Sequence, residues 1–519
     1  MTELLQDRVA RTVDAHPEET AVVMRSEGLT YVQLEQRSNQ LARLLLDHGL
    51  RRGDRVCLVQ PKAPAAIVSM LATLKAGGVY VPVDVASPAA RVEKIVACAA
   101  PRLLLASAEA SELLARLRSD AGVIAVSGVL EGAQAGARDA DAYDDGALPS
   151  ATRAGDAAHI LFTSGSTGTP KGVIITHAMV GAFLDWAIPY FGHRAGDRIS
   201  GHPPLHFDLS TFDVYGSLSV GAQLHLVPGD ILLPGQLASF IRDSQLTQWF
   251  SVPSTFAYMV RGDAIRDGDF PSLKRIVWCG EVMPPAVLAH WMRRVPHCTY
   301  TNLYGPTETT IASSYFTVTD ISEDEAAAIP IGTPCAGEAL RVLDEQLAEV
   351  SPGEIGELFI EGAGLSPGYW QDEEKTSISF VNSPHTGERL YRTGDLGRRD
   401  ERGLLHFIGR ADSQIKSRGY RIELGEIETA LSAVPGVAEC AIVGIPSGGF
   451  DGTAICAAWA SRPGAALDPQ QLRTSLSDAL PAYMLPTRWL ELTELPKNAN
   501  GKIDRPALKE RFASPSVNE

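Results

Sequence analysis

The stretch LFTSGSTGTPKGV, residues 161–173, is the most informative part of the chain. An apolar run at residues 159–162 leads into ten residues that are all hydroxylated, Gly, Pro or Lys. This pattern predicts a buried strand followed by a loop whose backbone N–H groups, hydroxyls and Lys171 bind a polyphosphate. The ordinary P-loop has Gly before its Lys and Ser or Thr after it, whereas Pro170 and Gly172 stand here. A kinase or GTPase loop is therefore excluded, and a solvated linker is the alternative.

Length and composition limit the class of protein. A chain of 519 residues is too long for one core, so we expect about two to four domains. With 45% hydrophobic and 21% charged residues, the composition is that of a soluble globular protein. The net charge of −16 argues against a sequence-blind nucleic-acid binder. The seven cysteines include no C-x-x-C pair, which favours buried free thiols over a zinc site or disulfide framework.

No targeting or membrane segment is visible. Apolar runs stay below the roughly 18 residues of a membrane span, so no membrane association is expected. The N-terminus lacks the basic and apolar regions of a secretory signal. The cytoplasm is the expected compartment.

Strand-like and helix-like patterns alternate over the first 130 residues, which predicts a parallel α/β sheet covered on both faces. Residues 131–156 lack periodicity and predict an exposed connection. A second series of strands and helices follows at 158–318, and after it come strand-like runs broken by Gly and Pro. The patterns of residues 412–519 again mix strands and helices. A charged, Gly-rich segment at 409–412 is a plausible domain boundary.

Further motifs follow the loop in a fixed order: HFDLS at 206–210, NLYGPTETT at 302–310, YRTGD at 391–395, GRADSQIKSRGYRIELGEIE at 409–428 and PKNANGKIDR at 496–505. The set resembles the adenylation domains of nonribosomal peptide synthetases, members of the acyl-adenylate-forming superfamily that includes acyl-CoA synthetases and firefly luciferase. The resemblance runs from residue 29 to Lys502. It implies an α/β fold with a large N-terminal domain (1–411) of layered α/β sheets plus a β-rich subdomain. A small mobile α+β domain (412–519) would follow, with its hinge at Asp412.

The resemblance also assigns an ATP and Mg²⁺ site. The phosphates would contact loop residues Thr163, Ser164, Gly165, Ser166, Thr167, Gly168 and Lys171. Tyr304 would stack on adenine with Thr309 nearby, Asp395 would accept hydrogen bonds from the ribose hydroxyls, and Arg410 would assist there. Glu308 matches the Mg²⁺-binding carboxylate, a ligand type that suits this ion. Taken alone, Glu308 would be a surface acid, Asp395 a turn residue and Tyr304 a core side chain.

Two lysines are the candidate catalytic residues. Lys502 matches the lysine that reaches both the substrate carboxylate and the α-phosphate when the small domain closes, where it would stabilise the transition state selectively. Lys416 matches a lysine that some relatives use in a second, thiol-dependent step. Segment 414–419 would line the tunnel for a phosphopantetheine arm. A loop lysine and a solvated basic hairpin are the ordinary alternatives for these two residues.

Asp208 matches the position that pairs with the α-ammonium of an amino-acid substrate in the peptide-synthetase branch. A buried carboxylate opposite an ammonium is a sensible clamp, because an unpaired charge would be costly. The other positions of the substrate pocket are uncharged: Leu209, Phe212, Thr255, Val277, Cys279, Leu303, Ile311 and Ala312. We therefore expect a neutral, small to medium side chain, and Thr255 is the least secure position.

The expected reaction joins these parts. The chain would activate a neutral α-amino acid with ATP to aminoacyl-AMP and pyrophosphate. It would then load the phosphopantetheine thiol of a separate carrier protein, or coenzyme A, in natural-product biosynthesis. The sequence contains no Leu-Gly-Gly-x-Ser carrier site, and only 17 residues follow Lys502. A small activating partner protein remains open. The alternatives are an acyl-CoA or amide ligase for a β-amino or other acid, and a degenerate homologue without turnover.

Overall fold

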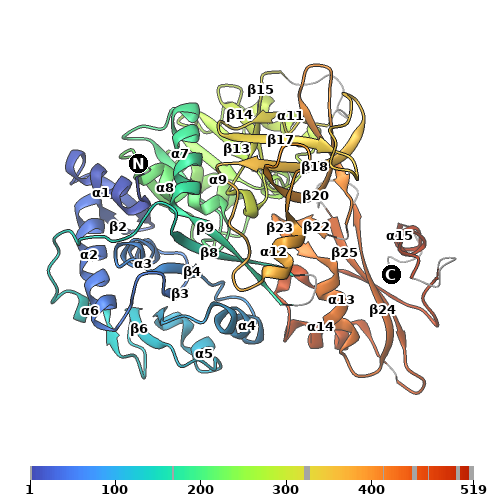
Figure 1. Ribbon diagram of the computed structural model, residues 1–519, viewed down its shortest axis with the longest axis horizontal. Helices are drawn as coiled ribbons and strands as arrows, with labels where there is room; N and C mark the ends of the chain where they lie inside the picture. Colours follow the sequence, from blue (N-terminus) through green and yellow to red (C-terminus); the bar gives the residue numbers. More distant parts are fainter. Residues whose placement is uncertain are drawn as a thin grey trace.

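The computed structural model describes residues 3–165, 169–320, 328–412, 414–446, 453–465, 467–497 and 503–513. Two large sheets form most of the first 340 residues (Figure 1). The nine-stranded sheet has the order β16 (Thr333–Pro334), β15 (Ser314–Val318), β14 (Thr299–Tyr304), β13 (Arg275–Trp278), β12 (Gln248–Ser251), β10 (Arg198–Gly201), β11 (Gln223–Leu226), β1 (Thr20–Met24) and β2 (Glu27–Thr30). The seven-stranded sheet has the order β7 (Ala135–Gly136), β6 (Gly122–Ser127), β5 (Leu103–Ser107), β3 (Arg55–Val59), β4 (Val79–Pro82), β8 (Ala157–Thr163) and β9 (Lys171–Thr176).

Helices connect and cover these strands. They are α1 (Leu5–Ala15), α2 (Tyr31–Asp47), α3 (Pro64–Lys75), α4 (Ala89–Ala99), α5 (Ser111–Leu114), α6 (Ala137–Ala140), α7 (His177–Phe191), α8 (Leu209–Leu218), α9 (Pro234–Asp243), α10 (Pro253–Arg261) and α11 (Pro285–Arg294). Helix α2 shows how local sequence sets a boundary. Thr30 accepts a hydrogen bond from the Gln33 backbone, and the Gln33 side chain accepts one from the Thr30 backbone, which completes a capping box.

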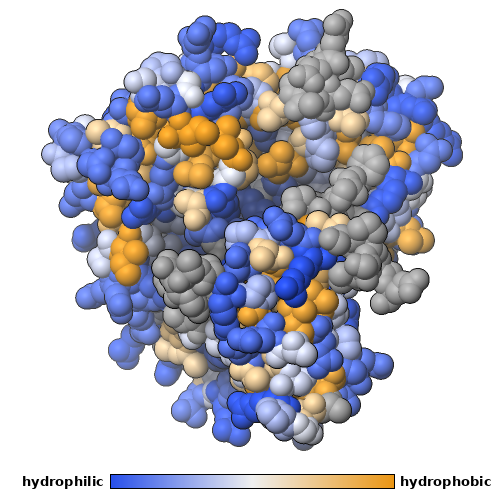
Figure 2. Space-filling view, turned by 90° about the vertical axis from the view of Figure 1, so that its right-hand side faces the viewer, coloured by the Kyte–Doolittle hydropathy of each residue, from blue (hydrophilic) through white to orange (hydrophobic). Residues whose placement is uncertain are grey.

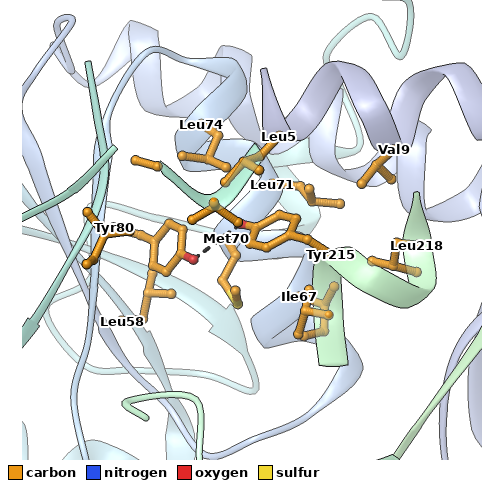
Figure 3. Packing of buried hydrophobic residues seen from close by; sticks show 14 of the residues in the cluster. Leu5, Val9, Leu58, Ile67, Met70, Leu71, Leu74, Tyr80, Tyr215 and Leu218 are labelled. Carbon is orange, nitrogen blue, oxygen red and sulfur yellow. Dashed lines mark hydrogen bonds between the residues drawn. The ribbon is translucent and has the colours of Figure 1, made fainter. Parts of the chain in front are cut away.

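The largest core contains residues of α1, α3 and α8 and of both large sheets, and Figure 3 shows part of it. Helix α3 is buried along most of its length because it lacks a polar face. Tyr215 on α8 donates a hydrogen bond of 3.3 Å to the hydroxyl of Tyr80 on β4. Figure 3 shows the side chains packed around this pair: Leu5, Val9, Leu58, Ile67, Met70, Leu71, Leu74 and Leu218. Each fully buried side chain of this size contributes about 1.5–3 kcal/mol, so this contact fixes the second series of elements on the first.

The predicted β-rich region is a five-stranded antiparallel sheet that follows the two large sheets. It contains β17 (Glu338–Leu343), β18 (Ile355–Gly362), β19 (Phe380–Asn382), β20 (Arg389–Arg399) and β21 (Leu405–Arg410), with α12 (Glu373–Ser379) beside it. The alternating α/β pattern and the later β region are thereby confirmed. The connection expected at 131–156 differs in part, because β7 pairs with β6 and α6 follows it.

The last part of the chain forms two small sheets, drawn on the right of Figure 1. A hairpin joins β22 (Gln414–Ser417) and β23 (Tyr420–Glu423), and β24 (Val437–Pro446), β25 (Thr453–Ser461) and β26 (Arg488–Glu491) form the other sheet. The helices here are α13 (Leu424–Ser432), α14 (Pro469–Ser477) and α15 (Arg505–Ala513). Figure 1 places the hairpin between β8–β9 and β24–β25. This hairpin contacts the earlier part of the chain, and so does α13 through Glu426.

The surface on this side is mostly hydrophilic, with hydrophobic residues in separate patches (Figure 2). Among the described residues, no helix has the length and apolar character that crossing a membrane requires. All seven cysteines are free, and five of them are buried.

Candidate active site

The hydroxyl-rich loop connects two paired strands. Thr163 at the end of β8 lies opposite Lys171 at the start of β9, so both ends of the loop are held together. Ser164 is buried, and a Cβ on Gly165 would lie 2.1 Å from the Thr169 carbonyl oxygen. Only glycine therefore fits at position 165 without rearrangement. Three predicted phosphate-binding residues lie outside the described residues: Ser166, Thr167 and Gly168.

Glu308, the predicted Mg²⁺ ligand, lies in a short 3-10 turn (Thr307–Thr309) after β14 and is fully buried. Its Oε1 accepts a hydrogen bond of 2.8 Å from the Tyr369 hydroxyl and lies 3.6 Å from Lys171 Nζ. Its Oε2 accepts a hydrogen bond of 2.9 Å from Arg421. Burial alone would raise the pKa of Glu308, but the charges of Arg421 and Lys171 outweigh it and lower the pKa to about 2. The carboxylate is therefore ionised.

The residues predicted to bind the nucleoside lie together. The Tyr304 hydroxyl, at the end of β14, donates a hydrogen bond of 2.6 Å to Asp395 on β20. Arg410 is the register partner of Asp395 and donates to its carboxylate. Arg410 also contacts the predicted hinge residue Asp412, with 2.6 Å between Nη2 and Oδ2. Thr309 is buried in the turn that follows β14. Strand pairing between β20 and β21 thus positions the carboxylate and the guanidinium.

Asp208 precedes α8 and lines the same cavity as the loop residues Thr163 and Ser164. Asp395 and Arg410 line this cavity as well. Burial raises the pKa of Asp208 to about 6, although a hydrogen bond from Thr307 opposes the shift. A cationic group beside this carboxylate would favour its ionised form.

Most of the predicted pocket residues are buried in one hydrophobic cluster: Leu209, Phe212, Val277, Cys279, Leu303, Ile311 and Ala312. Two of them, Leu209 and Cys279, also line the cavity. Thr255 lies on α10, is half-buried, and does not line the cavity. The cluster therefore forms an uncharged floor near Asp208, apart from Thr255.

The β22–β23 hairpin closes over this cavity. Lys416 Nζ lies 5.5 Å from the centroid of the Tyr304 ring, and Gly419 N donates a hydrogen bond of 2.8 Å to Glu281. The Ser164 hydroxyl donates a hydrogen bond of 2.7 Å to the Arg421 carbonyl. The hairpin thus contacts both the phosphate loop and the aromatic face predicted for adenine.

Sequence reasoning assigned no role to several residues of this closure. The Tyr420 ring packs edge-on against Phe207 at 4.9 Å and stacks on Tyr483 at 3.5 Å. Arg91 and Glu426 form a buried ion pair between the two parts of the chain. Phe207 lies within the motif at 206–210, and Tyr420, Arg421 and Glu426 lie within the motif at 409–428, but these motifs alone do not identify the partners of the four residues.

Lys502 lies outside the described residues. The described residues that flank this gap are held in the C-terminal part, where Lys497 pairs with Glu439 at 2.6 Å. Asp504 N donates a hydrogen bond of 2.7 Å to the Pro496 carbonyl. Within the described residues, no cluster of three or more His, Cys, Asp or Glu side chains could hold a metal. A bound Mg²⁺ would need Glu308 together with phosphate oxygens, which is a usual arrangement for this ion.

Comparison with known families decides the identity of this arrangement. Residues 9–370 match the family model for AMP-binding enzymes, and residues 426–502 match the model for their C-terminal domain. The chain belongs to the AMP-binding enzymes. AMP-binding enzymes use ATP. The cavity is lined by residues of the first match, such as Ser164 and Asp208, and by Asp395 in the segment between the two matches.

Curated relatives include a protein of similar length and a much longer one. The chain is 35% identical over 510 residues to L-proline--[L-prolyl-carrier protein] ligase of Pseudomonas fluorescens, covering 97% of this chain and 98% of that protein. It is 34% identical to surfactin synthase subunit 2 of Bacillus subtilis, covering 98% of this chain but 14% of that protein. The chain therefore spans one of these relatives nearly completely and only a small part of the other.

Solved structures agree with the fold. A holo nonribosomal peptide synthetase protein with adenylation and PCP domains, bound to a vinylsulfonamide inhibitor, superposes with a TM-score of 0.83. It is 29% identical, and the match covers 98% of this chain and 84% of that one. The Vibrio cholerae adenylation domain AlmE, in complex with glycyl-adenosine-5′-phosphate, has a TM-score of 0.83 at 24% identity, covering 97–98% of both chains, and shows the shared fold alone.

Proposed function

We propose that this AMP-binding enzyme activates a neutral, small to medium α-amino acid and transfers it to the phosphopantetheine thiol of a separate carrier protein. The observation that carries the proposal is the position of Asp208. Its buried carboxylate lines one cavity with the phosphate loop and with Asp395. An ammonium at Asp208 and a nucleotide between Ser164 and Asp395 would therefore face each other across one cavity.

In the first step, a carboxylate oxygen of the amino acid attacks the α-phosphorus of ATP. The bond from this phosphorus to the bridging oxygen breaks, and pyrophosphate leaves. Lys171 and the loop amides hold the phosphates, and Lys502 contributes the positive charge near the α-phosphate. Mg²⁺, held by Glu308 and phosphate oxygens, would neutralise charge on the leaving group. Asp395, oriented by Arg410, accepts hydrogen bonds from the ribose.

In the second step, the carrier thiolate attacks the carbonyl carbon of the aminoacyl-adenylate. A C–S bond forms, the C–O bond to the phosphate breaks, and AMP leaves. The hairpin that carries Lys416 and Gly419 belongs to this step, because it closes over the cavity and contacts Glu281. A groove behind it, lined by Ser254, Glu281 and Lys416, offers the thiol arm an approach.

The two steps require residues 412–519 to move as one unit about Asp412. Lys502 and the hairpin both belong to this unit, and the hairpin lines the cavity in the present arrangement. Lys502 would enter after the hairpin withdraws. Asp412, bonded to Arg410 at the edge of the β-rich sheet, lies where such a rotation would begin.

Pyrophosphate exchange across a panel of proteinogenic, β-amino and aryl acids tests this function. We expect exchange with a neutral α-amino acid, proline included because of the prolyl ligase relative. Thioester formation on a phosphopantetheinylated carrier is then measured against coenzyme A as acceptor. A preferred β-amino or aryl acid would overturn the assignment of Asp208 to an α-ammonium. A preference for coenzyme A or an amine as acceptor would identify an acyl-CoA or amide ligase instead.

A further inference from the structure

Two adjacent β-branched residues in the turn after Glu308 have left-handed backbone conformations. Thr310 has φ 61° and Ile311 has φ 68°. Such angles are genuine outliers for β-branched side chains, and strained residues persist only where their surroundings hold them. The turn joins Glu308 to Ile311 and Ala312, the last two of which belong to the buried pocket cluster. Whatever holds this turn therefore sets the shape of the amino-acid pocket.

A second loop runs against the turn. The Thr310 hydroxyl donates a hydrogen bond of 2.8 Å to the Gly364 carbonyl, and Ser366 N donates one of 2.9 Å to the Glu308 carbonyl. A Cβ on Gly364 would lie 2.5 Å from the Thr309 carbonyl oxygen, so the two backbones are in direct contact. The strained turn thus depends on the position of Gly364.

Glu338 holds Gly364 from the other side. Its Oε1 accepts a hydrogen bond of 2.7 Å from Gly364 N, and its Oε2 is buried without a partner among the described residues. Ser313, directly after the pocket residues, donates a hydrogen bond of 2.8 Å to Thr309, which directly precedes the strained pair. The Glu338 carboxylate therefore holds the loop that lies against the turn.

We propose that Glu338 is a positioning residue for substrate recognition, which fixes the Thr310–Ile311 turn through Gly364. The chain of contacts runs from the Glu338 carboxylate to Gly364 N–H, and from the Gly364 carbonyl to the Thr310 hydroxyl. Without it, the turn relaxes and Ile311 and Ala312 leave the positions that shape the pocket.

The metal end of the turn has anchors of its own. The Glu308 carboxylate is held by Tyr369 and Lys171, and its carbonyl by Ser366. Loss of Glu338 should therefore affect the amino acid much more than ATP. This selectivity separates a positioning role from a general loss of stability. The inference rests on the proposed function, because it assumes that the pocket containing Ile311 and Ala312 binds the amino acid.

The test compares Glu338→Ala and Glu338→Gln in pyrophosphate exchange. We expect Glu338→Ala to raise the amino-acid KM at least tenfold while the ATP KM and kcat change less than threefold. Glu338→Gln keeps a side-chain oxygen for Gly364 N–H and should stay within threefold of the parent. An amino-acid KM within twofold in Glu338→Ala, or equal damage in both variants, would overturn the proposal.

Glu361 provides a matched control. It lies on β18 beside Ala339, is partly buried, pairs with Arg341 at 2.6 Å, and also has one buried oxygen without a partner in the described part of the chain. Glu361→Ala should leave the amino-acid KM within twofold. If it raises this KM as much as Glu338→Ala, the effect is general destabilisation and the proposal fails.

Two further measurements keep the test independent of folding yield and of the proposed function. Thr310→Val removes the hydroxyl at the other end of the chain of contacts. The double variant Glu338→Ala, Thr310→Val should therefore raise the amino-acid KM by less than the product of the two single effects. A KM increase equal to that product would contradict the proposal. Hydrogen exchange of residues 309–313 should accelerate in Glu338→Ala but not in Glu361→Ala. Unchanged hydrogen exchange in Glu338→Ala would overturn the positioning role of Glu338. A parent chain that activates no amino acid would overturn the proposed function alone.

Discussion

The guanidinium of Arg421 lies 2.9 Å from the carboxylate of Glu308 and joins the hairpin to the predicted metal ligand. The carbonyl of the same residue accepts the hydrogen bond of Ser164 from the phosphate loop. Arg421 therefore occupies two groups that a bound metal and triphosphate would use. If the metal and triphosphate bind as proposed, the hairpin and the pyrophosphate end of ATP would compete for one place, and this competition would order the two half-reactions.

This competition predicts a selective effect of Arg421→Gln. The variant should form the thioester at least tenfold more slowly, because the docked hairpin loses a buried charge pair. Pyrophosphate exchange should stay within threefold of the parent, since it needs the hairpin withdrawn. Rates of both half-reactions, measured separately, check this expectation.

Arg418→Gln is the matched control for that experiment. Arg418 lies in the same hairpin but is exposed, and the substitution Arg418→Gln removes the same charge as Arg421→Gln. It should leave exchange unchanged. Parallel loss of both half-reactions in Arg421→Gln would contradict the competition between hairpin and pyrophosphate.

Asp208→Asn should reduce kcat/KM for the amino acid by more than 100-fold. Removing one partner of a buried ion pair costs about 3–5 kcal/mol, which corresponds to a loss of this size or larger. The ATP KM should change little, because the nucleotide contacts other residues. An unchanged amino-acid KM would show that Asp208 does not bind the ammonium group of the substrate.

The same carboxylate predicts a pH dependence. Burial raises the pKa of Asp208 to about 6, so the uncharged acid predominates below that pH and cannot attract an ammonium. The kcat/KM for the amino acid, which reports groups of the free enzyme, should fall about tenfold for each pH unit below 6. In Asp208→Asn, kcat/KM should not fall in this way below pH 6. If the fall persists in the variant, another group causes the pH dependence.

Gly419→Ala should slow thioester formation while exchange stays within threefold. Gly419 has φ +81°, and an added Cβ would lie 2.7 Å from Val252 Cγ1. The hairpin could therefore not dock in its present position. Gly403→Ala is a precise control, because Gly403 also has φ +81° but its Cβ would meet nothing within 4 Å. Backbone strain alone would damage both variants equally, and that result would argue against a docking role.

Much of the site could be predicted from the sequence, because short local patterns determine the strand, the loop and the residues within them. The strand, the hydroxyl-rich loop and Lys171 follow from composition and order, and β8 and β9 confirm the strand that leads into the loop. The resemblance also placed Tyr304, Asp395 and Arg410 at one nucleoside site, and these residues do lie together.

The contacts that depend on tertiary placement could not be predicted in the same way. Arg421 could be recognised as part of a motif, but its pairing with Glu308 depends on how the C-terminal part docks. The strain at Thr310 and Ile311 has no sequence signal, because β-branched residues do not favour positive φ. Glu338 lies in no quoted motif, and only the packing of Gly364 identifies it.

Lys502→Ala should reduce pyrophosphate exchange by at least 1,000-fold while ATP and the amino acid still bind. A cation that reaches the α-phosphate only after domain rotation contributes to the transition state and little to the ground state, so kcat falls and KM does not rise. Lys497→Ala is the control, because Lys497 lies nearby on the same segment and pairs with Glu439. Thioester formation from supplied aminoacyl-adenylate should survive in Lys502→Ala, since that step uses the hairpin. Retained exchange would show that another residue supplies the charge, and equal loss of both steps would mean that Lys502 supports the C-terminal fold instead.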